Sequence, residues 1–362
     1  MEYILNDVLE IKNGKNQKAV ENSEGQYPIY GSGGVIGYAD DYICDADTVV
    51  IGRKGSINNP IYVSEPFWNV DTAFGLVARR EVLLPRYLFY FCKKFDFEKL
   101  NKTVTIPSLT KSDLLNIKIK LPDIDEQQLV VDKLIRIESV MEFRKQELNV
   151  LDNLIKARFV EMFGDPIQNP KGWEVVTIGD IVTEVRYGTS KPAVEGGKYP
   201  YLRMNNLTAD GHLDLNDLKY IDIPDDEIEK CVVRKGDVLF NRTNSIELVG
   251  KTAVFDLPED MIIAGYIIRV RLTEKMLPEV LSQYMNLEAL KGILRGMAKG
   301  AVNQANINAQ ELQSIKVYIP EMELQKQFVK MKEQIYKSKV AVQKALDETQ
   351  MLFDSLMQEY FN

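Results

Sequence analysis

Basic, amide and hydroxyl side chains recur in several short segments that also contain glycine. Arginine can donate two hydrogen bonds to a guanine edge, asparagine and glutamine can bond adenine in the same way, and lysine, serine and threonine suit phosphate. A neighbouring glycine lets the backbone approach a duplex closely. These segments support a hypothesis of nucleic-acid binding, with the candidate contact residues Lys15, Arg53, Lys54, Ser56, Asn58, Lys102, Thr103, Thr105, Arg203, Asn205, Asn206, Arg242, Thr243, Asn244, Lys299, Asn303 and Gln304.

The composition of these segments also has a plain explanation. Asparagine, glycine and serine are ordinary turn residues, and surface lysine and arginine need no function. The chain carries a formal net charge of −8 at pH 7, which opposes binding to a polyanion unless the cations gather on one face. We therefore expect DNA binding by the isolated chain to be poor and sensitive to salt.

Motifs for enzymatic chemistry find little support, and we assign no catalytic residue. Asn59-Pro60-Ile61-Tyr62 lacks the second proline of the Asn/Asp-Pro-Pro-Tyr/Phe loop with which amino-methyltransferases hold a target amine. The glycine-rich residues 31–37 have the wrong spacing for a cofactor loop, and they favour a tight turn between strands. The sequence has no Gly-x-x-x-x-Gly-Lys-Ser/Thr loop for ATP and no convincing acidic cluster for Mg²⁺. The chain itself is therefore expected to hold no cofactor.

The few metal-binding and redox residues are isolated from one another. His212 is the only histidine, so it cannot form a metal cluster or a two-base relay with another histidine. Cys44, Cys92 and Cys231 are widely separated, which favours buried apolar thiols over a disulfide framework or a zinc site. We predict no metal site. With no leader-like start and no apolar run of roughly 18 residues, a cytoplasmic location is expected.

A long helix is predicted to position the loops. Between Pro122 and Gly164 the sequence has no glycine or proline, and apolar residues recur at spacings of three and four, the pattern of a coiled-coil stripe. Asp125 and Glu126 fall in its first turn, where carboxylates favour the helix dipole. At roughly 1.5 Å per residue, about forty residues form a rod on the order of 60 Å long, which suits a spacer.

A second copy of this helix is predicted near the C-terminus. Aligning Gln127 with Gln325 also places Phe163 on Phe361. Two equal helices with matching stripes most simply pack together, although two unrelated amphipathic helices in separate cores remain an alternative. We predict an antiparallel coiled coil with the packing residues Leu134, Ile137, Met141, Leu148, Leu151 and Ile155 in one helix and Phe328, Met331, Ile335, Val342, Leu352 and Leu356 in the other.

The remaining sequence predicts two mixed, mainly β globular domains, so the fold class is α+β. Turn residues separate strand-like runs such as 27–30, 48–51 and 73–78, and a helix is expected after Pro85. With 362 residues, 45% of them hydrophobic, the chain can bury a sizeable core and is expected to hold two or three domains. The predicted domains are a first globular domain (1–110), a linking region with the first long helix (111–163), a second globular domain (164–310) and a C-terminal linking region with the second helix (311–362).

The globular domains repeat one another more loosely than the helices do. Asp47 followed by Arg53 parallels Asp237 followed by Arg242, and the helix after Pro85 has a counterpart after Pro278. A repeat that keeps its scaffold while its loops diverge indicates two sites of similar geometry that recognise different things.

The order of these parts resembles a known family. A loop-rich domain, a long helix ending in Ala157-Arg158-Phe159-Val160-Glu161-Met162-Phe163-Gly164-Asp165-Pro166, then Lys171-Gly172-Trp173-Glu174, and a second domain and helix resemble the specificity (S) subunit of type I restriction-modification systems. The resemblance covers nearly the whole chain. It departs at the ends: the first domain has no Gly-Trp-Glu entry, and the second helix has no Asp-Pro exit.

The resemblance implies a subunit that recognises DNA but does not catalyse. It implies that each globular domain is a target recognition domain for half of a split DNA sequence, while the paired helices set the spacer. The implied partners are double-stranded DNA, two methyltransferase (M) subunits that carry S-adenosylmethionine, and restriction (R) subunits that use ATP and Mg²⁺. Two alternatives remain open: a coiled-coil protein-interaction scaffold without DNA specificity, and a self-contained DNA methyltransferase.

Overall fold

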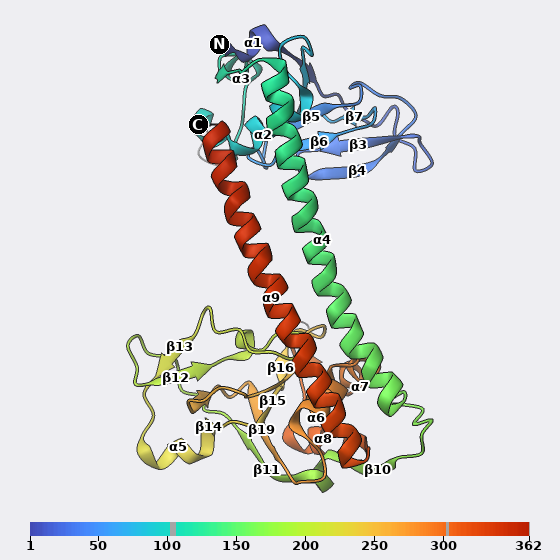
Figure 1. Ribbon diagram of the computed structural model, residues 1–362, viewed down its shortest axis with the longest axis vertical. Helices are drawn as coiled ribbons and strands as arrows, with labels where there is room; N and C mark the ends of the chain where they lie inside the picture. Colours follow the sequence, from blue (N-terminus) through green and yellow to red (C-terminus); the bar gives the residue numbers. More distant parts are fainter. Residues whose placement is uncertain (102–105, 302–303, 362) are drawn as a thin grey trace. The chain divides into compact units, whose positions relative to one another are not determined.

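The structure, a computed structural model, describes residues 1–101, 106–301 and 304–361. The chain divides into two compact units (Figure 1): unit 1 comprises Met1–Lys145 with Lys344–Asn362, and unit 2 comprises Gln146–Gln343. Each long helix therefore contributes one part to each unit. This grouping differs from the four predicted segments because each helix half packs on a globular part, and the four-segment division stays a prediction.

The first long helix, α4, spans Ile124–Phe163 without interruption. Asp123 caps its start by accepting a hydrogen bond from the Glu126 N–H at 2.8 Å. Gly164 ends it with φ +90°, a left-handed conformation that glycine adopts without a steric penalty. The boundaries of the helix thus follow the signals in the sequence.

The second long helix, α9, spans Met322–Tyr360 and packs against α4 in both units. In unit 1, Leu134 of α4 shares a core with Phe353 of α9. In unit 2, the Phe159 ring of α4 lies 5.3 Å from the Phe328 ring of α9. Because the early half of α4 meets the late part of α9 and the reverse holds in unit 2, the two helices run antiparallel, as predicted.

The predicted seam is largely buried, with one correction. Leu134, Met141, Ile155, Phe328 and Ile335 are buried; Ile137, Leu151, Met331 and Leu356 pack on the same cores; Leu148 and Val342 are half-buried. The prediction that Leu352 packs in the seam is wrong, because Leu352 is 52% exposed while Phe353 is buried. A straight α-helix advances 3.6 residues per turn, not 3.5, so the buried stripe drifts by one position toward the end of α9.

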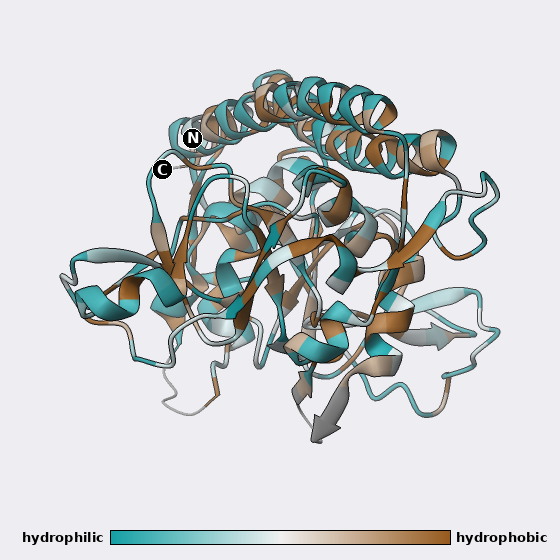
Figure 2. Cartoon of the chain, turned by 90° about the horizontal axis from the view of Figure 1, so that it is seen from below, coloured by the Kyte–Doolittle hydropathy of each residue, from teal (hydrophilic) through white to brown (hydrophobic). Residues whose placement is uncertain are grey.

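Polar residues within the seam form hydrogen bonds from one helix to the other. In unit 1 the Arg144 guanidinium of α4 donates to the carbonyl oxygen of Ala345 and to the Thr349 hydroxyl, both on α9. A buried polar pair is tolerated in a seam when its groups are hydrogen-bonded. In Figure 2 both long helices alternate hydrophilic and hydrophobic residues turn by turn, as expected of helices with one buried face.

The globular part of unit 1 is built from short strands. A four-stranded sheet has the order β2-β8-β5-β6, a three-stranded sheet has the order β4-β3-β7, and β1 pairs with β9. The elements are β1 (Glu2–Ile4), α1 (Leu5–Val8), β2 (Leu9–Asn13), β3 (Tyr27–Gly31), β4 (Gly34–Ala39), β5 (Thr48–Gly52), β6 (Ile61–Val63), β7 (Trp68–Asn69), β8 (Ala73–Ala78), α2 (Pro85–Lys94), η1 (Phe97–Leu100), α3 (Lys111–Leu115) and β9 (Lys118–Lys120). Within the glycine-rich residues 31–37, Ser32 and Gly33 form the predicted turn between β3 and β4.

Unit 2 repeats this architecture with additions. Its main sheets have the orders β11-β19-β15-β17 and β13-β12-β18-β14, β10 pairs with β22, and a further sheet has the order β16-β21-β20. The elements are β10 (Glu174–Thr177), η2 (Ile178–Ile181), β11 (Val182–Tyr187), β12 (Tyr199–Leu202), η3 (Met204–Asn206), β13 (Lys219–Ile221), α5 (Asp225–Cys231), β14 (Val232–Val233), β15 (Val238–Asn241), β16 (Thr243–Asn244), β17 (Thr252–Val254), β18 (Met261–Ile263), β19 (Ile267–Leu272), α6 (Pro278–Asn286), α7 (Glu288–Met297), β20 (Lys299–Ala301), β21 (Gln304–Asn306), α8 (Ala309–Gln313) and β22 (Lys316–Ile319).

Matching glutamines fasten each long helix to its globular part. The fully buried Gln127 of α4 accepts from the Leu84 N–H at 3.0 Å and donates to the carbonyls of Val82 and Pro122. The fully buried Gln325 of α9 accepts from the Leu277 N–H at 2.9 Å. Gln325 likewise donates to two backbone carbonyls, those of residues 275 and 320. The repeat therefore extends to individual hydrogen bonds.

The motifs that flank the end of α4 have a structural role. The Trp173 indole N–H donates to the Phe163 carbonyl at 2.7 Å, and the Tyr318 hydroxyl donates to the Gly164 carbonyl at 2.8 Å. These bonds satisfy carbonyls that a helix C-terminus leaves unpaired. The Phe-Gly-Asp-Pro and Gly-Trp-Glu motifs thus hold the helix exit against the start of unit 2's globular part.

The cysteines are buried and the histidine stacks on an aromatic ring. Cys44, Cys92 and Cys231 are free and buried, as predicted, and burial raises the pKa of the Cys44 thiol to about 12. His212 stacks on Tyr336 with ring centroids 4.7 Å apart. In the described part of the chain, no group of three histidine, cysteine or acidic residues is arranged to hold a metal ion. Nor does any helix there combine the length and apolar character needed to cross a membrane.

Candidate nucleic-acid interface

In unit 1, two of the predicted contact loops are tied to the segment that joins β7 to β8. The Lys15 N–H donates to the Asn69 carbonyl at 2.9 Å, and the Arg53 N–H donates to the Thr72 carbonyl at 2.8 Å. Gly14 permits the first contact, because a Cβ there would lie 1.8 Å from the Val70 carbonyl oxygen. Loops that are distant in sequence thus meet at one edge of the sheet.

Unit 2 has the same arrangement at the segment that joins β18 to β19. The Thr189 N–H donates to the Ile263 carbonyl at 2.9 Å, and the Arg242 N–H donates to the Tyr266 carbonyl at 3.0 Å. A Cβ on Gly188 would lie 2.1 Å from the Ile263 carbonyl oxygen. Gly188 is therefore the structural counterpart of Gly14.

Arg53 and Arg242 occupy equivalent positions. Besides the matching N–H bonds, the Arg53 carbonyl accepts from the Leu109 N–H and the Arg242 carbonyl accepts from the Ile307 N–H, both at 2.9 Å. The match inferred from the two Asp-led strands is therefore present in the backbone. Whether these arginines contact bases stays a prediction.

The arginine side chains differ in their surroundings. The Arg53 guanidinium is exposed and lies 5.7 Å from the centre of the Phe74 ring. The Arg242 guanidinium is half-buried and lies 4.9 Å from the centre of the Tyr187 ring, with Nη1 donating to the Gly265 carbonyl at 3.4 Å. Its Nε is buried without a hydrogen-bond partner. Arg242 is therefore held in place before any ligand arrives, whereas Arg53 is freer to move.

Further predicted residues of unit 1 flank Arg53. Lys54 and Ser56 are exposed, and Lys54 forms a β-bridge with Ser108. Lys102, Thr103 and Thr105, three further predicted contacts, lie outside the described residues.

The side chain of Lys15 is free to contact a ligand, whereas that of Asn58 is hydrogen-bonded within unit 1. The Lys15 side chain is exposed. Asn58 donates to the Asp96 carboxylate at 3.1 Å and accepts from the Phe97 N–H at 2.7 Å. Asn58 therefore holds the start of η1, and a contact between Asn58 and DNA stays a prediction.

In unit 2 the fold joins two predicted contact segments. Thr243 and Asn244 form β16, which pairs with β21, and β21 pairs with β20. The Thr243 hydroxyl is buried and donates to the Asn306 side-chain oxygen at 3.0 Å, while the Asn244 amide donates to the Asn241 side-chain oxygen at 2.8 Å. Lys299 lies in β20 and Gln304 in β21, and Asn303 between them is outside the described residues.

The predicted segment 203–206 is partly occupied by contacts within unit 2. The Arg203 guanidinium donates to the Asp217 carboxylate at 2.8 Å, and hydrogen bonds from Lys219 and Arg203 lower the pKa of Asp217 below its ordinary value. Asn206 is 2% exposed, accepts from the Arg203 N–H and donates to the Asp214 carbonyl. Asn205 is exposed. Asn206 therefore shapes the loop, and its contact with a base stays a prediction.

Several residues of this edge were not among the predicted contact residues. Tyr187 and Tyr266 are 43% and 49% exposed beside Arg242, and aromatic rings are common supports for arginine. Gly14 and Gly188 are a second omission. Gly14 directly follows β2, which pairs with β8, and Gly188 directly follows β11, which pairs with β19. A glycine at the end of a strand-like run was the available sequence signal.

Together these features define a protein with two β-sheet units, each presenting a cationic loop edge, and with a shared pair of antiparallel helices. The sequence matches the family described as "Type I restriction modification DNA specificity domain" over residues 1–153 and 170–349. The chain belongs to this family.

Individual relatives agree with this assignment. The chain is similar to the type I restriction enzyme EcoKI specificity subunit of Escherichia coli (strain K12), with 23% identity over 328 residues that cover 85% of this chain and 70% of that protein. It is also similar to the type I restriction enzyme MjaIX specificity subunit of Methanocaldococcus jannaschii, with 27% identity over 180 residues that cover 43% of this chain and 40% of that protein.

A solved structure shares the fold. The S subunit of a type I restriction-modification system from M. genitalium matches with a TM-score of 0.62 and 16% identity, covering 100% of this chain and 96% of that one. At this identity the likeness establishes the fold alone. It agrees with the predicted α+β class of two sheet-rich domains and long helices.

Proposed function

We propose that this chain is the DNA-recognition subunit of a type I restriction-modification complex. Each unit would contact one half of a bipartite DNA target through the loop edge that carries Arg53 in unit 1 and Arg242 in unit 2. The observation that supports this most is the duplicated edge: matching backbone bonds hold an arginine at the same position of two sheets whose loops differ.

The loop edges suit the major groove of B-DNA. The groove displays a distinct pattern of donors and acceptors for each base pair, and a side chain with paired donors can distinguish guanine there. Arg242, braced by Tyr187 and Gly265, would contact a base with little loss of side-chain entropy. The exposed Lys15, Lys54 and Ser56 would bind phosphates and set the register of unit 1 on the duplex.

The chemistry would reside in partner subunits. Two methyltransferase subunits carrying S-adenosylmethionine would modify the half-sites, and restriction subunits using ATP and Mg²⁺ would join this core. With a net charge of −8, the chain would depend on basic surface from these partners for tight binding. This chain would then act as a non-catalytic specificity subunit.

The matched arginines test the proposal directly. In a complex with its methyltransferase, Arg53→Ala should weaken or relax recognition of one half-site, and Arg242→Ala should do so for the other half-site. A lost bidentate base contact reduces discrimination by about 10- to 100-fold. Sequencing of methylated positions across a genome would show the altered half of the motif.

A matched control separates recognition from general damage. Arg79 follows the opposite end of β8 from the Arg53 anchor, and its side chain is exposed. Arg79→Ala should leave both half-sites intact. If both arginine variants keep the full motif, or if the complex methylates without regard to a two-part motif, the proposal fails.

The long helices are proposed to set the spacer between half-sites. Removal of one heptad from both helices keeps their stripes in register and shortens each helix by about 10 Å. The unrecognised gap in the methylation motif should change. The same gap in the shortened protein would contradict this role of the helices.

A further inference from the structure

Each unit contains a cavity at an equivalent place, and the two cavities differ in chemistry. The unit 1 pocket, about 650 Å³, is bordered by Gln350, Phe353 and Asp354 of α9. The unit 2 pocket, about 230 Å³, is bordered by Asp152, Ile155 and Lys156 of α4. These two sets of residues match when the two long helices are aligned on Gln127 and Gln325.

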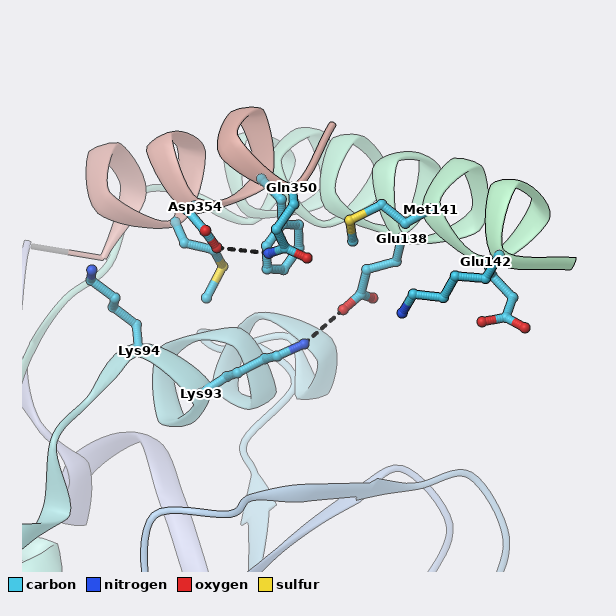
Figure 3. Close-up of a pocket in the computed structure, with 10 residues that line it drawn as sticks. Lys93, Lys94, Glu138, Met141, Glu142, Gln350 and Asp354 are labelled. Atoms are coloured by element: carbon cyan, nitrogen blue, oxygen red, sulfur yellow. Dashed lines mark hydrogen bonds and ion pairs between the residues drawn. The ribbon is translucent and has the colours of Figure 1, made fainter. Parts of the chain in front are cut away.

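In the unit 1 pocket, one lysine forms an ion pair with a glutamate on the pocket wall. The Lys93 ammonium forms an ion pair with the Glu138 carboxylate at 3.0 Å, as Figure 3 shows, and the Tyr90 hydroxyl donates to the same carboxylate at 2.6 Å. The Lys94 ammonium donates to the side-chain oxygen of Gln358, which follows the lining residue Met357. Lys93 of this pocket therefore has an acidic partner on the pocket wall.

The unit 2 pocket contains buried lysines without acidic partners. Lys251 is 8% exposed and donates to the carbonyls of Met204 and Leu207; Lys291 is 9% exposed and donates to the Gly250 carbonyl. Lys332, which also lines this pocket, is half-buried, and the described residues provide it with no hydrogen bond or ion pair.

The acidic groups that line the unit 2 pocket already form ion pairs or hydrogen bonds with other residues. Asp152 and Asp210 both accept from Lys339. Glu288 accepts from Arg295 at 2.6 Å. Glu247 is exposed and bonds within its own loop, and bonds from that loop lower its pKa. The buried Lys251 and Lys291 therefore form no ion pair with the described residues, although the Glu288 carboxylate acts on Lys291. The carboxylates of Glu279 and Asp210 act on the half-buried Lys332.

Buried cations that form no ion pair carry a free-energy cost that a bound anion can relieve. Desolvation lowers the pKa of Lys291 to about 8 and also lowers the pKa of Lys251 and of Lys332. Carbonyl oxygens satisfy some of their donors, but they supply only partial negative charge. A bound anion would supply the full charge and favour the protonated lysines.

We propose that the unit 2 pocket, with Lys156, Lys251, Lys291 and Lys332 on its wall, binds a phosphate group. The cavity of about 230 Å³ is smaller than the roughly 300–1,000 Å³ of sites for drug-sized ligands, so it suits a small anion. A tetrahedral phosphate accepts hydrogen bonds from several ammonium groups at once.

The pocket is adjacent to the predicted contact strand of unit 2. Lys291 bonds the Gly250 carbonyl, and the Gly250 N–H donates to the Asn241 carbonyl at 2.9 Å, directly before Arg242. The phosphate group could therefore come from free phosphate or a small phosphate ester, or from the backbone of bound DNA. An experiment without DNA distinguishes these sources.

The full chain is titrated with inorganic phosphate at constant ionic strength, with chloride as the compensating salt, while its thermal unfolding is followed. The wild-type protein should be stabilised in the manner of a single-site ligand. Lys291→Met and Lys332→Met should each weaken phosphate affinity about tenfold or more. Lys337→Met, on an exposed site of the same helix as Lys332, should match the wild type.

A second measurement uses non-specific duplex DNA over a range of salt concentrations. If the pocket takes a backbone phosphate, Lys332→Met should reduce the slope of log K against log salt by about one, even where free phosphate has no effect. The proposal is overturned if phosphate stabilises all four proteins equally, or if neither free phosphate nor the salt slope responds to the lysine variants.

Discussion

The two units of this protein share a frame and differ at the edges that the frame supports. Each has a four-stranded sheet, a buried glutamine that fastens a long helix, and an arginine held by matching backbone bonds. Unit 2 adds α7 and the sheet β16-β21-β20, and strand register places Lys251 where unit 1 has Asn59. The comparison teaches that packing and backbone hydrogen bonds constrain the frame, while solvent-exposed loops are free to diverge.

The largest effect is expected at the glycines where two backbones meet. A Cβ on Gly14 or Gly188 would lie within 2.1 Å of a carbonyl oxygen, and backbone must shift to accommodate it. We expect Gly14→Ala and Gly188→Ala each to cost about 4 kcal/mol in the free energy of unfolding, or to prevent folding of one unit. Tyrosine or tryptophan fluorescence during urea unfolding measures the loss.

Each unit contains one tryptophan, so the damage can be located. Trp68 reports on unit 1 and Trp173 on unit 2, and a Trp→Phe background isolates either signal. Gly296→Ala is the control, since a Cβ there meets no atom within 4 Å and alanine favours a helix by up to about 1 kcal/mol. Wild-type stability in both clash variants would contradict the close backbone contacts at the two glycines.

The buried lysine of unit 2 predicts a pH dependence that distinguishes the units. Burial lowers the pKa of Lys291 from 10.5 to about 8. Below pH 8 both the folded and unfolded states carry the charge, and the folded state bears the cost of desolvation. As pH rises from 8 to 10.5 the folded lysine loses its proton first, so the free energy of unfolding gains up to about 3 kcal/mol.

The measurement is the difference in unfolding free energy between the wild type and Lys291→Met, in phosphate-free buffer across this pH range. The wild type should gain on the variant as pH rises, and the change should appear in the Trp173 signal. A difference that stays constant between pH 8 and 10.5 would show that the Lys291 charge is not penalised in the folded state.

A smaller and equal effect is expected at the two glutamines. Gln127→Leu leaves the Leu84 N–H and two carbonyls without their partner, and Gln325→Leu does the same at Leu277. Each change should lower the unfolding free energy of its own unit by about 2 kcal/mol. If the two variants lose unequal amounts of unfolding free energy, or if the loss appears in the other unit, the two glutamines do not have equivalent roles. The structural repeat would then hold for the backbone only.

Much of the frame could be predicted because its signals are local. The ends of α4 follow from Asp123 and Gly164, and the turn at residues 31–37 follows from its glycines. The equivalence of Arg53 and Arg242 was predicted because each follows a strand that begins after an aspartate. The placement of Leu352 in the seam failed because a strict heptad ignores the drift of a straight helix, which buries Phe353 instead.

The candidate site was less predictable, because its residues acquire partners only through the fold. Asn58 and Asn206 looked like base-contacting amides, yet one holds η1 and the other is 2% exposed inside its loop. Tyr187 and Tyr266 were not predicted as site residues, since a single tyrosine next to a strand carries no periodic signal. Their position beside Arg242 became apparent only when β11, β15 and β19 were assembled.

The sequence by itself determined the repeat, the two long helices, the α+β class and the resemblance to a specificity subunit, because periodicity, capping residues and duplicated motifs are properties of neighbouring residues. The tertiary structure alone decided which loops share an edge, which amides are occupied and which buried lysines form no ion pair. These properties depend on contacts between residues far apart in the chain, and the free energy of burying a polar group depends on those contacts.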